Sequence, residues 1–152
     1  MTCDIIVRQA QAGDVERLTE IAHAAKAHWG YPSEWLELWR PSLTFDAALL
    51  EREWVQLAEV DDRAMAVVAV AGEPPTLELS HLWVAPETMG LGLGRRLFEA
   101  AVAHARLSGA ARLEIISDPY AEDFYLHLGA LRVGDIESQP AGRRLPLLAV
   151  QL

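Results

Sequence analysis

Several features that define whole classes of protein are missing from this sequence. Cys3 is the single cysteine, so neither an internal disulfide nor a cysteine-built metal site can form. No apolar run reaches about 18 residues, the length that predicts a membrane-spanning helix. The start, MTCDIIVRQA, alternates like a strand and lacks the basic segment of an export signal. We therefore expect a cytoplasmic protein with no metal and no membrane partner.

Positive charge is also scarce. Lys and Arg total 13 against 22 Asp and Glu, which gives a formal net charge of -9, and no basic cluster is longer than a pair. Because nucleic-acid phosphates are bound by clustered Lys and Arg, we expect no nucleic-acid partner. An acidic surface is more compatible with a cationic amine.

The pattern of apolar residues predicts one domain over residues 1–152, without repeats or linkers. Strand-like runs lie at residues 3–10, 54–60, 64–71, 76–84, 111–117, 131–138 and 143–152. Helical spacing predicts a helix from Gly13 to near Gly30, two short helices before Trp54 with Thr44 as a cap, and two further helices after residues 92 and 118. The sequence therefore predicts a mixed α/β fold with a largely antiparallel sheet flanked by helices.

The most informative segment is the glycine run MGLGLGRR at residues 89–96. It follows a predicted strand stopped by Pro86 and precedes a predicted helix. Glycines allow positive φ, so their amides can converge, and a helix N-terminus adds unpaired N–H groups and partial positive charge. The run predicts a cradle for a phosphate or pyrophosphate, with a flexible turn as the alternative.

Two common phosphate motifs do not fit this run. A Walker A loop ends in Gly-Lys-Ser/Thr, whereas Gly94 is followed by Arg95 and Arg96. The dinucleotide fingerprint G-x-G-x-x-G needs a third glycine where the chain has Arg95 or Leu97. P-loop and Rossmann interpretations are therefore excluded on spacing.

The run resembles the acyl-CoA signature of the GNAT (general N-acetyltransferase) superfamily, Gln/Arg-x-x-Gly-x-Gly/Ala at a strand-to-helix junction. Gly92 and Gly94 take the glycine positions, and Met89 stands where Gln or Arg is usual. A second segment, SDPYAEDFYLHLGALRVG at residues 117–134, is similar to the family's Asn/Asp, aromatic-Tyr and Gly-Phe stretch, here with Asp118 and Phe124-Tyr125. Ala130 replaces the usual Phe.

The resemblance implies a GNAT-like fold in which two strands splay apart to admit an acyl-pantetheine arm. It also implies acetyl-CoA (coenzyme A) as acyl donor. The residues that it assigns to this donor are Leu82, Trp83, Val84, Met89, Gly90, Leu91, Gly92, Leu93, Gly94, Arg95, Arg96, Asp118 and Tyr125.

Acyl transfer from a thioester to an amine requires two proton movements. The amine, with a pKa of about 10.4, must lose a proton, and the departing thiolate should gain one. The resemblance implies Tyr125 as the acid, with packing as the alternative role. For the base, Glu78 matches the spacing of a catalytic glutamate in some members, and His81 has a suitable ordinary pKa of about 6.5. A water relay or no single base stays open as well.

The acceptor side is expected near His28, Trp29 and Tyr31, which surround Gly30 in a predicted loop. Their rings could frame an amine, including by cation–π contact. Trp35 and Trp39 lie four residues apart, so a core stripe is the alternative for them. His23, His104 and His127 are isolated and are expected to be structural.

The sequence thus predicts an acetyl-CoA-dependent N-acetyltransferase that transfers acetyl directly to a primary amine. The alternative is a non-catalytic acyl-CoA-binding regulatory module. The acceptor, a small molecule or a peptide amine, is not identified by the sequence, and a homodimer stays an open alternative for the assembly.

Overall fold

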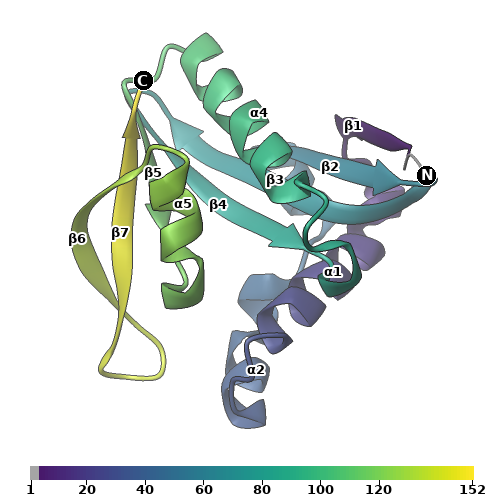
Figure 1. The fold of residues 1–152 in the computed structure, drawn as a ribbon, viewed down its shortest axis with the longest axis horizontal. Helices are drawn as coiled ribbons and strands as arrows, with labels where there is room; N and C mark the ends of the chain where they lie inside the picture. The colour runs from purple at the N-terminus through teal and green to yellow at the C-terminus, as the bar shows by residue number, and fades with distance from the viewer. Residues whose placement is uncertain (1–3) are drawn as a thin grey trace. The chain divides into compact units, whose positions relative to one another are not determined.

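The computed structural model describes residues 4–152, so Cys3 and the start of the first predicted strand lie outside the described residues. Hydrogen bonds join seven strands in the order β1-β2-β3-β4-β5-β7-β6 (Figure 1). Their bounds are β1 (Ile5–Gln9), β2 (Trp54–Val60), β3 (Arg63–Glu73), β4 (Thr76–Val84), β5 (Arg112–Ile116), β6 (Leu131–Ser138) and β7 (Arg143–Gln151). β1 and β2, β5 and β7, and β6 and β7 pair antiparallel, whereas β4 and β5 pair parallel. The predicted mixed, mostly antiparallel sheet is confirmed.

In the described part of the chain, five α-helices accompany the sheet. They are α1 (Val15–Ala27), α2 (Ser33–Trp39), α3 (Ala47–Arg52), α4 (Leu93–Leu107) and α5 (Glu122–His127). Short 3-10 turns precede or follow them at η1 (Ala12–Asp14), η2 (Arg40–Leu43), η3 (Pro86–Thr88) and η4 (Pro119–Ala121). Within residues 4–152, every helix is too short or too polar to span a bilayer.

The chain divides into two compact units. The first contains the residues up to Ala69 and His81–Glu99, and the second contains Val70–Ser80 and Ala100–Leu152. β3, β4 and α4 each contribute to both units. The single domain expected over residues 1–152 stays a prediction.

In the first unit, α1 buries the apolar stripe that its spacing predicts. Leu18, Ile21, Ala22 and Ala25 are each at most 4% exposed. Arg17 Nε donates a hydrogen bond of 2.9 Å to the carbonyl oxygen of Ala64 on β3. Side-chain burial and this hydrogen bond both hold α1 against the sheet.

A tight hairpin turn joins β2 and β3. Asp61 and Asp62 have φ of 50° and 70°. Positive φ at both central residues is the requirement of a type I′ turn, whose twist matches that of the flanking strands. Asp tolerates this conformation better than most residues, so a turn without glycine forms here.

The predicted helix cap at Thr44 is wrong. α3 begins two residues later than that cap requires, because Asp46 Oδ1 accepts a hydrogen bond of 2.8 Å from the Leu49 amide. Thr44 instead ends η2, and its hydroxyl donates to the Arg40 carbonyl at 2.8 Å. Both residues are good caps, so sequence preference alone does not separate them.

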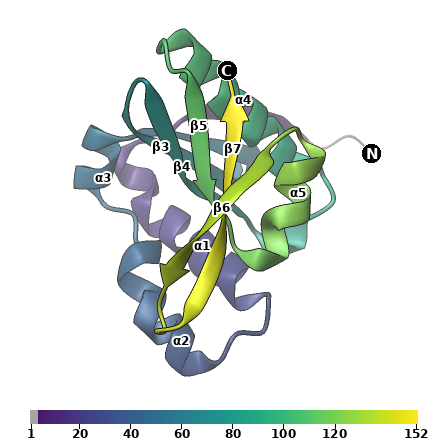
Figure 2. The same cartoon turned by 90° about the vertical axis from the view of Figure 1, so that its left-hand side faces the viewer.

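In the second unit, β5 and β7 form the buried strands and β6 forms a hairpin with β7 (Figure 2). Leu113, Ile115 and Leu148 are each at most 2% exposed. α5 is tied to β6 by an ion pair of 3.4 Å between Glu122 and Arg132.

Candidate active site

The glycine loop has the backbone that its sequence predicts. β4 ends at Val84, η3 follows, and φ reaches 95° at Gly90 and 79° at Gly92. A Cβ atom built on either glycine would meet nothing within 4 Å. Glycine is therefore required here by backbone conformation, and the space in front of the loop is not filled by this chain.

The start of α4 offers unpaired backbone donors next to these glycines in sequence. The first bond of the helix ladder runs from the Arg96 amide to the Gly92 carbonyl at 3.1 Å. The amides of Leu93, Gly94 and Arg95 therefore have no carbonyl one turn earlier to accept from them. The first turn contains no acidic residue. This end of the helix is complementary to an anion.

The third glycine differs from the other two. Gly94 lies within the first turn of α4, where the backbone is helical. Glycine at this position is therefore not required by a positive φ. The lack of a side chain instead permits close approach of a ligand to the backbone. Among the flanking side chains, Met89 and Leu91 are 40% and 43% exposed, and Arg95 Nε pairs with Glu99 at 2.8 Å.

The end of β4 carries three half-buried residues, Leu82, Trp83 and Val84, that lead into the loop. The Trp83 indole N–H donates a hydrogen bond of 2.9 Å to His81 Nδ1. The His81 ring also lies 4.7 Å from the Phe45 ring, centroid to centroid. His81 is thus held between two aromatic residues.

These contacts weaken His81 as a base. Because an indole nitrogen can only donate, Nδ1 must be unprotonated, and the proton of the neutral ring then lies on Nε2. Burial lowers the pKa of His81 to about 4. At neutral pH the ring is uncharged, with one nitrogen occupied and the other already protonated.

Glu78 lies where two strands stop pairing. The parallel ladder of β4 and β5 consists of Thr76 with Arg112, Leu77 with Leu113, and Glu78 with Glu114. β4 continues to Val84 and β5 to Ile116, yet the register ends at Glu78. Glu114 is engaged by Arg112 at 2.9 Å. An early end of this ladder is what a splayed strand pair requires.

Tyr125 and Asp118 belong to the second unit and are connected by electrostatics. Tyr125 is 6% exposed on α5, and burial together with the Asp118 carboxylate raises the pKa of its phenol. Asp118 accepts a hydrogen bond of 2.9 Å from the Tyr120 amide and lies 3.8 Å from Arg143. Asp118 therefore also caps η4 and pairs with a nearly buried Arg.

The predicted acceptor residues are dispersed. His28 is exposed and makes an edge-on ring contact of 5.4 Å with Trp29. Tyr31 instead joins Trp35 and Trp39, at ring separations of 6.0 Å and 4.9 Å. Trp39 is 8% exposed, as expected of a core residue.

Lys26 lies within this aromatic group, and the sequence analysis missed it. Its ammonium nitrogen is 4.5 Å from the Trp39 ring, 5.1 Å from the Tyr31 ring and 6.0 Å from the Trp83 ring. The side chain is buried, with the residue 8% exposed. The available signal was its place four residues after Ala22, on the buried stripe of α1.

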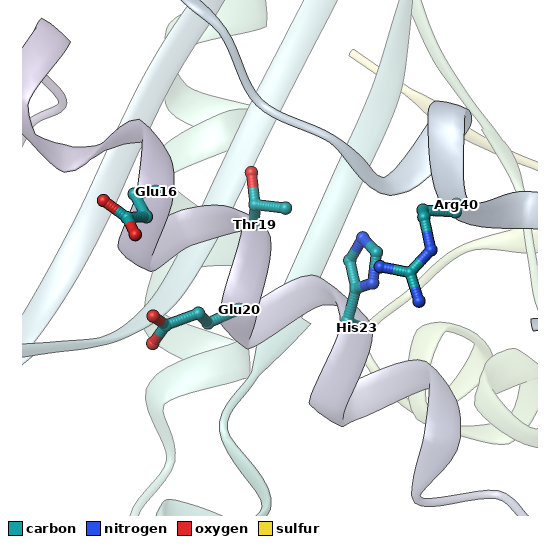
Figure 3. Close-up of a pocket in the computed structure, with 5 residues that line it drawn as sticks. All are labelled: Glu16, Thr19, Glu20, His23 and Arg40. Atoms are coloured by element: carbon teal, nitrogen blue, oxygen red, sulfur yellow. The ribbon is translucent and has the colours of Figure 1, made fainter. Parts of the chain in front are cut away.

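A pocket lies beside α1, lined by residues far from the glycine loop in sequence. Figure 3 shows His23 and Arg40 side by side, with Glu16, Thr19 and Glu20 along the same helix as His23. Partial burial and the Arg40 charge lower the pKa of His23. No group of three or more metal-binding side chains occurs in residues 4–152. This pocket lacks a cradle and is not the candidate site.

Comparison with known proteins identifies the class. The sequence profile of the Acetyltransferase (GNAT) family matches residues 15–130, and the chain belongs to this family. Among curated proteins, sequence comparison finds no significant match.

Solved structures share the fold. A GCN5-related N-acetyltransferase from Rhodopseudomonas palustris aligns with a TM-score of 0.84 at 19% identity, covering 100% of this chain and 99% of that chain. The PaiA N-acetyltransferase from Thermoplasma acidophilum, solved with coenzyme A, aligns with a TM-score of 0.81 at 16% identity, covering 98% and 99%. A ribosomal-protein alanine N-acetyltransferase from Escherichia coli gives a TM-score of 0.72 at 17% identity, covering 97% and 94%.

Proposed function

We propose that this protein is an acetyl-CoA-dependent N-acetyltransferase that transfers acetyl directly to a primary amine. The observation that supports this most is the cradle formed by Gly90, Gly92 and the first amides of α4. It pairs open space with unpaired donors, as an anionic pyrophosphate requires. The related Thermoplasma enzyme was solved with coenzyme A.

In the proposed reaction, a C–N bond forms to the acceptor amine while the thioester C–S bond breaks. One proton leaves the amine and one is taken up by the departing thiolate. The bound thioester supplies the acetyl group, and the chain must supply orientation and proton transfer. We also propose that the enzyme works in the cytoplasm and needs no metal.

For the base, the geometry favours Glu78 over His81. His81 uses Nδ1 to accept from Trp83, and its lowered pKa leaves it a weak proton acceptor. Glu78 is an exposed carboxylate at the last paired residue of the β4–β5 ladder. We propose that it removes the amine proton, directly or through a water relay.

For the acid, we propose Tyr125. Since burial raises the pKa of its phenol, the proton is retained at neutral pH and above. The same shift makes full transfer to a thiol of ordinary pKa about 8.5 uphill. Tyr125 therefore acts first as a hydrogen-bond donor to the developing thiolate. Its proton is transferred late, and the proton removed from the amine returns to the phenolate through Glu78 or solvent.

The position of Lys26 changes which residues we assign to the acceptor site. The faces of Tyr31 and Trp39 already contact the Lys26 ammonium, so those rings do not need a second cation. We propose that His28 and Trp29 contact the acceptor and that Tyr31 supports the wall behind them.

Incubation with acetyl-CoA and a mixed panel of small and peptide amines tests the proposal. Amine-dependent release of free thiol, together with an acetylated amine in the mass spectrum, is expected. Tight binding of coenzyme A without thiol release from any amine would instead support the regulatory module. If the protein neither binds coenzyme A nor releases thiol, the glycine loop is not an acyl-CoA site.

A further inference from the structure

The outer edge of β6 is a surface that the proposed activity does not use. β6 is last in the strand order, so within residues 4–152 no strand pairs with this edge (Figure 1). Leu131 is 66% exposed and Val133 is 47% exposed. Long edge strands with exposed apolar residues are templates for pairing with another chain unless they are blocked.

A bulge determines which β6 side chains share a face. Arg132 pairs with Leu148 and Gly134 pairs with Leu147, so Val133 is the extra residue. Because the register resumes after it, Arg132 and Asp135 lie on the same face of the sheet. Leu131 and Ile136 lie together on the other face.

Three charged residues of β6, Arg132, Asp135 and Glu137, lie on this face. Glu122 on α5 contacts Arg132 at 3.4 Å. Asp135 pairs with Arg144 on β7, on the same face. The face therefore presents an arginine before Gly134 and two carboxylates after it.

We propose that this edge joins two copies of the chain in a symmetric dimer, with the two β6 strands antiparallel about Gly134. With the bulged Val133 left out of the ladder, Arg132 of each copy then lies opposite Asp135 of the other, and Leu131 lies opposite Ile136. A two-fold axis repeats each favourable pair, as an isologous interface requires. Gly134 meets itself at the axis and has no side chain to obstruct the approach.

Neighbouring registers are disfavoured by charge. If the two strands are centred on Asp135, the Asp135 carboxylates of the two chains lie opposite each other. Centring them on Ile136 places Asp135 opposite Glu137 twice. Like charges directly opposite one another destabilise a sheet pair, so the Gly134 register is selected.

The contact also covers apolar surface beside the strand. Phe124 and Leu126 on α5 are 37% and 38% exposed, and α5 is attached to this face through Glu122. A ladder of five paired residues per strand, together with these side chains, forms a small interface. The dimer is therefore expected to depend on protein concentration and to weaken with added salt.

Analytical ultracentrifugation of the full chain and of charge-reversed variants tests this assignment, which does not rest on the proposed activity. Wild type should approach twice the chain mass as concentration rises. Arg132→Asp and Asp135→Arg should each stay at the mass of one chain, because each places like charges together at both sites. An equimolar mixture of the two variants should recover the doubled mass, since opposite charges then meet again at both sites.

Glu137→Arg is the matched control, because it makes the same kind of charge change on the same strand but lies opposite uncharged Ala130. It should dimerise as wild type does. Circular dichroism of each variant verifies that the fold is kept. A wild-type protein that stays monomeric at high concentration overturns the proposal, and so does a mixture of folded variants that fails to associate.

Discussion

Burial changes the proton affinity of two residues in ways that decide their chemistry. His81 loses affinity for a proton and so becomes a weaker base. Tyr125 holds its proton more tightly and so stays a donor at neutral pH and above. Neither shift follows from residue type, because both come from what surrounds the side chain after folding.

The His81 shift predicts a loss of stability in mild acid. Its folded pKa of about 4 lies below an unfolded value of about 6.5, so the unfolded state binds the proton first as pH falls. Wild type should lose roughly 3 kcal/mol between about pH 6.5 and pH 4 from this group alone. Urea unfolding of wild type and His81→Asn at both ends of this range measures it. Parallel losses in the two proteins would show that other groups carry the acid sensitivity.

Replacement of the proposed acid should separate chemistry from packing. Tyr125→Phe keeps the ring and deletes the donor, and kcat should fall about 10- to 1,000-fold with coenzyme A affinity within a few-fold of wild type. Tyr120→Phe, an exposed tyrosine in the turn before the same helix, serves as the control. Rates must be taken where chemistry limits turnover. An unchanged kcat in Tyr125→Phe would assign this residue to packing.

At the scale of elements, the strand boundaries were the most predictable part of the fold. The runs at residues 54–60, 76–84 and 131–138 match β2, β4 and β6 at both ends. Their alternating or continuous apolar patterns, with turn residues at each end, leave few other solutions. The 3-10 turns were not predicted, because three- or four-residue turns carry no periodicity to detect.

Some parts of the candidate site could be predicted from the sequence and others could not. The glycine loop could be predicted because Gly90 and Gly92 are required by backbone conformation, which is local. The contact of Lys26 with Tyr31 and Trp83 could not, because it joins three separate segments. The choice between Glu78 and His81 also needed the Trp83 hydrogen bond, which only the fold supplies.

The glycine loop predicts a specific loss of coenzyme A binding. Gly92→Val and Gly109→Val both place a β-branched residue at φ near 80°, at the beginning and at the end of α4. Each should cost about 1–3 kcal/mol of stability from backbone strain. Only Gly92→Val should weaken the binding of coenzyme A. We expect a loss in affinity of about 10- to 100-fold, because charge-assisted contacts with the backbone are lost. Calorimetric titration of both variants with coenzyme A measures the two affinities. Equal affinities would show that the glycine loop does not bind coenzyme A.

The loop after α1 predicts an effect on the acceptor alone. Trp29→Ala should raise the acceptor KM by about 2- to 30-fold, the range of one cation–π contact, with coenzyme A affinity unchanged. Trp39→Ala is the contrasting variant. Because Trp39 is buried against Lys26, its replacement should destabilise the fold. If Trp29→Ala unfolds the protein instead, Trp29 belongs to the core and the pocket lies elsewhere.

At the scale of the whole molecule, ligand binding should be visible as stability. Coenzyme A at about 100 times its Kd adds about 2.7 kcal/mol to a native state that alone binds it. For a chain of 152 residues, Tm should rise by roughly 5–10 °C. Scanning fluorimetry with and without coenzyme A measures this rise, with Gly92→Val as the variant that should lose it. An equal rise in Gly92→Val would place the ligand away from the loop.

Lys26 is the only lysine in the sequence, and the structure turns its amine inward among aromatic rings. Thioesters acylate accessible amines even without catalysis, so an enzyme that handles acetyl thioesters is exposed to damage by its own donor. Here every other basic side chain that is charged at neutral pH is an arginine, whose guanidinium is not deprotonated in proteins and is a poor nucleophile. The side chains of this protein therefore offer the proposed acetyl-CoA donor no exposed lysine, and acetyl-lysine found in its reactions reports on other proteins.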